Sequence, residues 1–371
     1  MAELTYNQVA KIKVFGVGGA GSNAVNRMVQ EGVQGVEFYI ANTDLQAMDI
    51  SPVANKIQLG KEGLGAGGNP DNGRKAAVES EDAIRKSMEG ADMVFLTAGM
   101  GGGTGTGAAP IIAKAAMDCG ALTVAVVTKP FSFEGKKRWN RATKGIQYLT
   151  NFVDSLVIIP NDRLIDSSEK NTTMLEAFSM ADDVLRQGVQ GISDLISEYG
   201  IVNVDFADVK TIMEGRGVAH MGVGIGTGDN RIEDAVRNAI ESPLLETSID
   251  GARSILLYVC GGYDMGMQDI SKIASKIQDE ADPDANIIFG ATVNENMNDK
   301  VSITLIATDF TSGGLSAPIN ETPEVASPSV RGTRVNVDGL EGQIVDMSDF
   351  MKEDHKDNSG SSDFDVPDFL K

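Results

Sequence analysis

Nine consecutive residues in the first third of the chain, Gly99–Gly107, carry almost no side chains. The run reads Gly-Met-Gly-Gly-Gly-Thr-Gly-Thr-Gly, follows the apolar segment Asp92–Ala98 and precedes an Ala- and Ile-rich segment, Ala108–Met117. A glycine-rich loop between a buried strand and a helix start can turn its backbone N–H groups toward an anion, and the helix N-terminus adds partial positive charge. A flexible linker has no need of such flanks. The run therefore predicts a phosphate-binding loop, with the Thr104 and Thr106 hydroxyls as further hydrogen-bonding groups.

A second glycine-rich segment, Gly16–Gly21, follows the apolar residues Ile12–Gly16 and has the spacing Gly-x-Gly-x-x-Gly. The spacing alone is weak evidence, because dinucleotide-binding domains share it. Asp44, 23 residues after Gly21, stands near the position of the ribose-binding carboxylate in such domains. An NAD(P)-binding oxidoreductase is therefore the main alternative. The loop Gly99–Gly107, which such an enzyme does not need, argues against it, and no P-loop motif is present.

The run Gly101–Gly107, Gly-Gly-Gly-Thr-Gly-Thr-Gly, resembles the signature of the tubulin/FtsZ superfamily of self-assembling GTPases. Other segments are similar to the FtsZ family of bacterial cell-division proteins, and these lie at Gly16–Asn23, Ala41–Asp44, Phe131–Arg138 and Asp363–Lys371. The resemblance covers roughly residues 10–310 and the last nine residues. It implies a tubulin-like GTPase domain with a mostly parallel sheet, a long central helix and a second α+β domain.

The resemblance also implies which residues bind the nucleotide, GTP or GDP. Mg²⁺ would be held mainly by the phosphates, with no protein metal site. The implied nucleotide contacts are Gly18, Gly19, Ala20, Gly21, Ser22, Asn23, Asn42, Asp44, Gly101, Gly102, Gly103, Thr104, Gly105, Thr106, Gly107, Glu134, Arg138, Asn161, Phe178 and Asp182.

Two pairs of these residues stand four apart in the sequence. Spacing alone makes Glu134 and Arg138 a solvated ion pair, whereas the resemblance implies contacts to ribose and phosphate. Phe178 and Asp182 share a helical face, where a ring can stack on a purine. A carboxylate accepts hydrogen bonds from N1–H and the N2 amino group of guanine, and adenine has no such donor pair. Together with the resemblance this favours GTP over ATP, whereas the pattern alone favours a core Phe beside a surface Asp. Asp183 is adjacent, so the choice of Asp182 rests on the resemblance.

Two further carboxylates lie in the segment Asn203–Lys210, where Asp205 and Asp208 stand three apart at a predicted helix start. Ordinary helix capping explains such residues. The segment also resembles the FtsZ loop that enters the nucleotide pocket of the next subunit. That resemblance implies catalytic roles for Asn203, Asp205 and Asp208, which would orient or polarise the attacking water. Each active site would then need two chains, and such head-to-tail contacts give filaments because they do not close.

The elements that must position these residues alternate between strand and helix. The predicted strands are Ile12–Gly16, Val36–Ala41, Asp92–Ala98, Leu122–Thr128 and Ser155–Ile159. The predicted helices are Ser22–Gln30, Gly73–Met88, Ala108–Met117, with Pro110 in its first turn, and Lys136–Thr150. This order predicts a mostly parallel sheet with helices on both faces, where the loops after the strands converge on one ligand. A long helix over Thr173–Tyr199 follows, and then a second region with strands at Val218–Gly226, Ser254–Cys260, Ala285–Val293 and Lys300–Ala307.

Composition changes at Thr311. From there to Lys371 the chain has 5 Lys and Arg against 12 Asp and Glu, which predicts disorder. The last nine residues regain apolar side chains and resemble the FtsZ terminal peptide, which implies membrane-tethering and regulatory division proteins as partners. The expected organisation is a GTP-binding domain at 1–171, a central helix at 172–200, a C-terminal α+β domain at 201–310, a disordered linker at 311–362 and a partner-binding peptide at 363–371.

Composition narrows the remaining function classes. A net charge of −21 disfavours nucleic acid as a partner. The apolar runs are far shorter than the ~20 residues that span a bilayer, and the N-terminus lacks a signal-peptide pattern, so we expect a cytoplasmic protein. The resemblance to the FtsZ family further implies a position at the midcell division ring under the membrane. Two His and two Cys make a zinc site improbable, and we expect Cys119 and Cys260 to be buried thiols. A plasmid-segregating tubulin-like filament is a further alternative, disfavoured by the terminal peptide.

Overall fold

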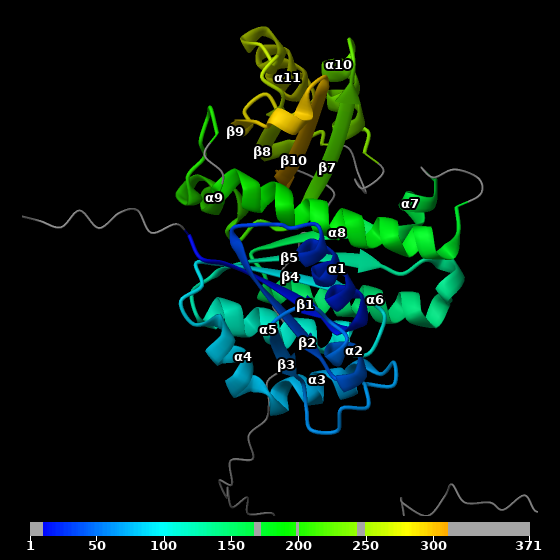
Figure 1. Cartoon of the computed structure of the whole chain (residues 1–371). Coiled ribbons are helices and arrows are strands. Elements are labelled where there is room, and N and C mark those ends of the chain that lie inside the picture. The colour runs from blue at the N-terminus through cyan, green and yellow to red at the C-terminus, as the bar shows by residue number, and fades with distance from the viewer. Residues whose placement is uncertain (1–9, 167–171, 198–199, 243–248, 311–371) are drawn as a thin grey trace, which may run out of the picture. The chain divides into compact units, whose positions relative to one another are not determined.

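The computed structural model describes residues 10–166, 172–197, 200–242 and 249–310. They belong to one compact unit, which spans Met1–Pro318. The predicted linker at 311–362 and the predicted peptide at 363–371 lie outside the described residues. Within the unit, one long helix, α8 (Met174–Ser197), lies between an N-terminal region, residues 10–166, and a C-terminal region, residues 200–310 (Figure 1).

The strands of the described residues follow the order β3-β2-β1-β4-β5-β6-β7-β10-β8-β9. Strands β1 to β6 pair in parallel, whereas β10 is antiparallel to both β7 and β8. The mostly parallel sheet is therefore confirmed. The strands are β1 (Ile12–Val17), β2 (Val36–Asn42), β3 (Asn55–Gln58), β4 (Met93–Gly99), β5 (Leu122–Lys129), β6 (Ser155–Pro160), β7 (Gly217–Thr227), β8 (Ala252–Gly261), β9 (Asn286–Val293) and β10 (Lys300–Phe310).

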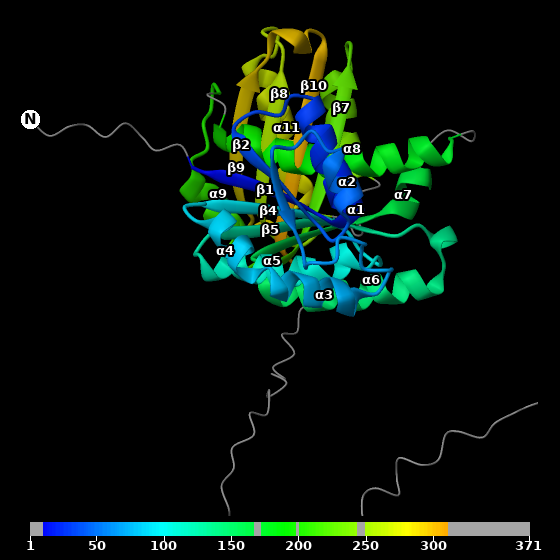
Figure 2. The same ribbon diagram turned by 60° about the horizontal axis from the view of Figure 1, so that its bottom comes forward.

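Successive residues of the parallel strands point to opposite faces of the sheet, and each face has its own core. Val14 and Phe95 lie in the core covered by α1 and α8, whereas Phe15 and Leu96 lie in the core covered by α3 to α6 (Figures 1 and 2). A third core packs α10 and α11 against β8 and β10. The other helices are α1 (Gly18–Gln30), α2 (Leu45–Asp49), α3 (Pro70–Glu79), α4 (Glu81–Met88), α5 (Thr104–Asp118), α6 (Lys136–Leu149), α7 (Asn161–Asp166), α9 (Phe206–Met213), α10 (Arg231–Ile240) and α11 (Met267–Glu280).

The predicted long helix is present as α8. Its 24 residues span about 36 Å at ~1.5 Å per residue. Leu185, Val189 and Ile192 of its apolar face are buried in the same core as residues of β4 and β5. On the side of the C-terminal region, a Cβ at Gly191 would lie 2.8 Å from Cγ2 of Thr304 in β10. The glycine therefore permits the close approach of α8 to the second region.

The predicted helix Gly73–Met88 is wrong in two respects, because it begins at Pro70 and because Ser80 divides it into α3 and α4. The Ser80 hydroxyl accepts a hydrogen bond from Gly60 N (2.9 Å) and donates one to Gln58 O (3.1 Å). The break therefore ties the helix pair to the end of β3, an edge strand that we did not predict.

Two further helices begin earlier than predicted. We expected starts at Ser22 and Ala108, whereas α1 begins at Gly18 and α5 at Thr104. Pro110 is therefore the seventh residue of α5 and lies inside the helix, outside its first turn. The glycines that suggested loops are the cause of the error.

Close packing explains these helical glycines. A Cβ at Gly107 would lie 2.0 Å from the backbone oxygen of Pro70, and one at Gly21 would lie 2.3 Å from that of Thr97. Real Cβ atoms do not approach so closely. The glycines therefore let α5 pack against α3, and α1 against β4, at distances that a side chain would forbid.

The two cysteines are not both buried as expected. Cys119 is exposed at the end of α5, Cys260 is half-buried in β8, and neither is part of a disulfide. No helix among the described residues combines the length and apolar character that crossing a membrane requires.

Candidate nucleotide-binding site

The two glycine-rich segments meet at the carboxyl ends of β1 and β4. Gly18 has φ +71°, and a Cβ there would lie 2.7 Å from Gly105 N. A Cβ at Gly99 would lie 2.6 Å from that of Ala20. By contrast, nothing lies within 4 Å of a Cβ at Gly19, which leaves open space beside the start of α1. The expected convergence of the two loops is therefore present.

The second loop is held in place by its own threonines. Thr106 Oγ1 is buried and accepts a hydrogen bond from Gly101 N (2.8 Å), and Gly101 has φ +99°. The Thr104 and Thr43 hydroxyls lie 2.6 Å apart. A Cβ at Gly102 would meet nothing within 4 Å. The threonine side chains thus fix the backbone of the loop, and its open side lies at Gly102.

A third glycine-rich segment, residues 60–68, was missed by the sequence analysis. Five of its nine residues are glycines with positive φ, namely Gly60, Gly63, Gly65, Gly67 and Gly68. A Cβ at Gly103 would lie 2.8 Å from Cβ of Ala66 and 3.0 Å from Asn69 N. The segment therefore packs directly on the second loop. Its glycine count was the signal that could have identified it.

Two of the implied contact residues have buried polar atoms without a partner. Ser22 Oγ and Asn161 Oδ1 belong to side chains that are 3% and 4% exposed, and neither atom has a hydrogen-bond partner among the described residues. An unpartnered buried polar group costs about 1–3 kcal/mol, so such groups usually meet a ligand or water. Ser22 lies in the second turn of α1 and Asn161 at the start of α7, directly after β6. Both positions fit a ligand at this edge of the sheet.

The segment after β2 uses its polar side chains to shape the backbone. Asn42 is buried, and its Oδ1 accepts from Thr43 N (2.9 Å). Asp44 caps α2, because its Oδ1 accepts from Gln46 N (3.0 Å) and Ala47 N (3.3 Å). The structure thus gives Asn42 and Asp44 a local role beside the glycine loops.

Glu134 and Arg138 meet as the spacing indicates, although no helix begins at Glu134. Glu134 ends a 3₁₀ turn, and α6 starts after Gly135, which has φ +94°. One Glu134 oxygen pairs with Arg138 Nη1 (2.9 Å), and the other accepts from Phe131 N (2.9 Å). The Glu134 side chain is 9% exposed and that of Arg138 is 49% exposed. The carboxylate is therefore fixed, and the guanidinium remains accessible.

Phe178 and Asp182 lie one turn apart near the start of α8. The Phe178 ring is partly exposed and packs edge-on against Phe131, with centroids 5.2 Å apart. Asp182 is half-buried and has no hydrogen bond or ion pair within the described ranges. Burial raises the pKa of its carboxyl to about 6, and the nearby charge of Arg27 opposes this shift. A ring beside an uncommitted carboxylate is the arrangement that guanine recognition requires.

Asp183 has a different environment from its neighbour. Its carboxylate pairs with Arg27 (3.5 Å) and Arg186 (2.9 Å) and accepts from Gln187 Nε2 (2.8 Å). These contacts occupy both oxygens. The geometry therefore favours Asp182 over Asp183 as the carboxylate available to a base.

The candidate catalytic residues lie beyond the other end of α8 (Figure 1). Asp205 caps α9, with its Oδ1 accepting from Asp208 N (2.8 Å), and both side chains are exposed. Asn203 Oδ1 accepts from Gly200 N (2.6 Å), and a short bridge from Val202 to Ala291 ties this segment to β9. The structure therefore does not bring these residues to the glycine loops of the same chain.

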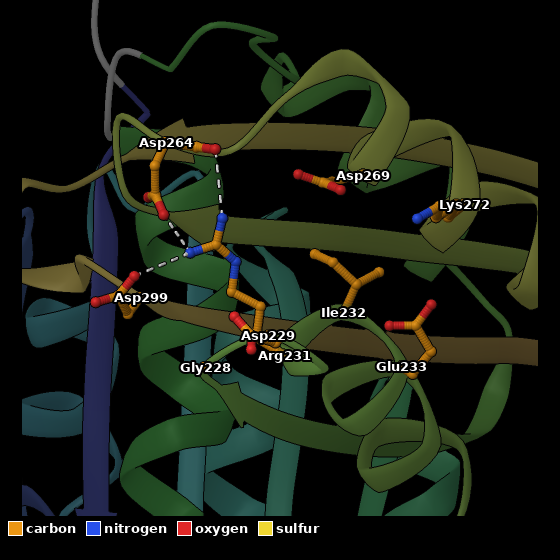
Figure 3. A pocket seen from close by; sticks show the side chains of 9 residues that line it. All are labelled: Gly228, Asp229, Arg231, Ile232, Glu233, Asp264, Asp269, Lys272 and Asp299. Atoms are coloured by element: carbon orange, nitrogen blue, oxygen red, sulfur yellow. Dashed lines mark hydrogen bonds and ion pairs between the residues drawn. The ribbon is translucent and has the colours of Figure 1, made fainter.

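A separate polar cavity of about 300 Å³ lies at the end of β7 that is remote from β6 (Figure 3). The guanidinium of Arg231 points to Asp264, which it contacts directly, and to Asp299 at 3.9 Å. The hydrogen bond from Arg231 is the main cause of a lowered pKa for Asp264. These contacts join the start of α10 to the β8–α11 and β9–β10 connections of the C-terminal region. No cluster of three or more acidic, His or Cys residues in the described part of the chain could hold a metal ion.

Comparisons with known proteins agree with this geometry. Residues 11–169 match the GTPase domain of the Tubulin/FtsZ family, and residues 217–311 match the C-terminal domain of the FtsZ family. An FtsZ dimer structure from M. jannaschii is 43% identical, with a TM-score of 0.78 over 82% of this chain and 90% of that chain.

More distant structures share the fold. The GDP-bound monomer of CetZ1 from Haloferax volcanii is 21% identical, with a TM-score of 0.69 over 80% of this chain and 93% of that chain. The GTPγS-bound protofilament of CetZ2 from the same organism is 19% identical, with a TM-score of 0.68 over 81% and 93%.

The strand order β3-β2-β1-β4-β5-β6 also occurs in dinucleotide-binding domains, so the sheet alone does not separate the two hypotheses. The second and third glycine loops and the matched GTPase domain do, and they argue against the oxidoreductase. Together with the 43% identity over most of both chains, the two matched domains show that this chain belongs to the FtsZ family of tubulin-like GTPases.

Proposed function

We propose that this protein hydrolyses GTP, assembles head-to-tail into filaments and forms the division ring in bacterial cytokinesis. The observation that carries the proposal is the position of Asp205 and Asp208. They lie beyond the end of α8, a helix of 24 residues or about 36 Å, whereas the residues suited to hold the nucleotide lie on its first three turns or before it. One chain therefore has both halves of an active site but cannot join them.

The nucleotide half is assigned as follows. The phosphates lie against the open sides of the loops at Gly19 and Gly102, where the starts of α1 and α5 carry no acidic residue in their first turns. Such helix starts favour anions. Arg138 and Glu134 contact ribose or phosphate, and Asp182 accepts from the guanine edge. Ser22 and Asn161 gain the hydrogen-bond partners that the protein itself does not supply.

The catalytic half comes from the next chain. Its Asp205 and Asp208 are exposed and hold their backbone geometry through the helix cap. In the filament they orient the water that attacks the terminal phosphate. Mg²⁺ on the phosphates would offset their negative charge. An FtsZ from M. jannaschii forms a dimer, and a CetZ2 forms a protofilament; both support assembly of this kind.

Exposed apolar side chains at both ends of α8 support a head-to-tail contact. Phe133, Met174 and Leu175 are 59%, 67% and 81% exposed near its start, and Ile201 is 67% exposed beyond its end. Phe133 and Met174 also line an apolar cavity of about 280 Å³. Exposed apolar patches mark interaction sites, and these two would be buried together between successive chains.

The place of action and the partners follow from the resemblance. We propose a cytoplasmic filament under the membrane at midcell, held by tethering proteins that bind Asp363–Lys371, with no nucleic acid partner. Deleting that peptide should leave GTP hydrolysis and assembly unchanged and abolish recruitment to vesicles that carry the tether. Equal recruitment of the truncated and full-length chains would assign the membrane link to the folded regions. Binding to a DNA-bound adaptor instead of a membrane tether would support the plasmid-segregating alternative.

Assembly-dependent hydrolysis tests the proposal as a whole. Light scattering should rise with GTP and not with GDP, and phosphate release per chain should increase above a threshold protein concentration. A rate per chain that stays constant on dilution to the monomer would contradict it.

A further inference from the structure

Arg27 links the helix that follows the first glycine loop to the helix that carries the candidate base-binding residues. It lies on α1, and its Nη1 donates to the backbone oxygen (3.2 Å) and to the hydroxyl of Ser179 on α8. Its Nη2 pairs with Asp183 at 3.5 Å. Its side chain is 31% exposed, and its Nε has no partner among the described residues. One guanidinium therefore fixes α1 against the first turns of α8.

The two adjacent carboxylates on α8 respond differently to Arg27. Asp183 is paired with it, and Arg186 and Gln187 complete the contacts of that carboxylate. Asp182 feels the charge of Arg27 but forms no ion pair with it. The two carboxylates therefore have different roles: that of Asp183 neutralises Arg27, and that of Asp182 remains half-buried without an ion pair.

We propose that Arg27 is a positioning residue for guanine recognition: by holding Asp183 in an ion pair, it leaves the Asp182 carboxylate as the acceptor open to the base. This inference rests on the proposed GTP-binding function. Arg27 also connects α1, which follows the first glycine loop, to α8, which carries the base-binding residues. Replacing Arg27 would therefore change the binding of the base, although Arg27 does not contact the base itself.

The charge of Arg27 has a measurable consequence. Desolvation raises the pKa of Asp182 to about 6, and Arg27 is the group that lowers it. On α8 itself, Asp183 and Arg186 pair with each other. Of the other elements packed against α8, α7 carries Asp162 and Arg163, and β5 ends at Lys129; the charge that opposes the shift is that of Arg27. Because guanine donors need the ionised carboxylate, affinity should fall as the pH decreases through the pKa.

The test measures the dissociation constant of GDP by calorimetry between pH 5.5 and 8.5, with inosine diphosphate, which lacks the N2 amino group, as a comparison. GDP avoids assembly and hydrolysis. In the natural protein, affinity should fall below a midpoint near pH 6. R27A should move the midpoint up by about one unit, since nearby charges shift a pKa by about 1–3 units. R27K should restore it. D183N frees Arg27 for Asp182 and should move the midpoint down.

The outcomes separate the possible explanations. Opposite shifts for R27A and D183N, with rescue by R27K and a GDP preference over inosine diphosphate that falls in R27A, support the proposal. A structural role alone would lower affinity at every pH with an unchanged midpoint, and that result would overturn it. A natural protein that fails to bind GDP at all would instead reject the proposed function. A D182N variant that keeps the pH midpoint would show that another group titrates.

Discussion

The two ends of α8 carry the two halves of the candidate active site, and they are built in opposite ways. At the start of α8, three glycine-rich loops pack against one another with distances that exclude side chains. Beyond its end, Asn203, Asp205 and Asp208 are exposed, and the Asn203 and Asp205 side chains accept hydrogen bonds from nearby backbone N–H groups. The nucleotide half is preorganised within one chain. The other half is a short exposed segment, suited to enter a pocket that its own chain does not contain.

The largest effect should come from Asp208, whose substitution tests the exposed half. D208A should reduce GTP hydrolysis by on the order of 100-fold or more, as expected for a lost catalytic group, while GTP binding stays intact. Phosphate release and nucleotide affinity measure the two properties separately. D208A leaves the Asp205 cap of α9 in place, whereas D205A removes that cap and should in addition cost about 1 kcal/mol of stability. Normal hydrolysis by D208A would remove this residue from the mechanism.

The packed half should be sensitive to a single methyl group. G107A places a Cβ 2.0 Å from the Pro70 backbone oxygen, and overpacking of this kind costs about 1–3 kcal/mol or more. G102A meets nothing within 4 Å and should leave the free energy of unfolding nearly unchanged while weakening nucleotide binding at the open side of the loop. Denaturant unfolding compares the two variants. Equal free energies of unfolding for G107A and G102A would contradict the close packing of Gly107 against Pro70.

Asp182 should show a conflict between binding and stability. Because its pKa is about 6 in the folded protein and near 3.8 in the unfolded chain, its ionised form costs stability at neutral pH, by on the order of 1–3 kcal/mol. D182N should therefore raise the melting temperature of the nucleotide-free protein at pH 7 and weaken GTP binding, with a smaller preference over ATP.

The pH dependence gives the sign of this effect. A raised carboxyl pKa means that the folded state binds the proton more tightly, so the stability penalty is full above about pH 6 and disappears as the pH falls toward 4. The gain from D182N should shrink over that range. A gain that is independent of pH would point to a cause other than ionisation, and unchanged GTP affinity would point to Asp183 or a backbone group as the base contact.

The same contrast explains what sequence reasoning could and could not predict. The buried parallel strands are recognisable as apolar runs, and two of the three glycine loops from their composition, so these were predicted. Edge strand β3, Asn-Lys-Ile-Gln, has no apolar run and was missed. The glycines at the starts of α1 and α5 were interpreted as loop residues, although they permit close packing. The predicted starts of both helices were therefore too late in the sequence.

The environments of the site residues depend on contacts between residues that are far apart in the sequence. Sequence spacing did not decide between Asp182 and Asp183, and the contacts of Asp183 with Arg27, Arg186 and Gln187 separate them. Asp44 has the position of a ribose ligand in the sequence but caps α2 in the structure. The roles of the nucleotide-binding and catalytic residues and the proposed domain boundaries remain predictions.

Complementation between two inactive variants tests the shared active site most directly. D208A keeps a working nucleotide pocket and lacks the catalytic carboxylate, whereas D182A keeps the carboxylates and has a weakened pocket. At limiting GTP each variant alone should hydrolyse slowly. A mixture should hydrolyse GTP well above the sum of the two, because D182A chains donate Asp208 to the pockets of D208A chains. A mixture no more active than the sum of its parts would contradict an active site formed between successive chains.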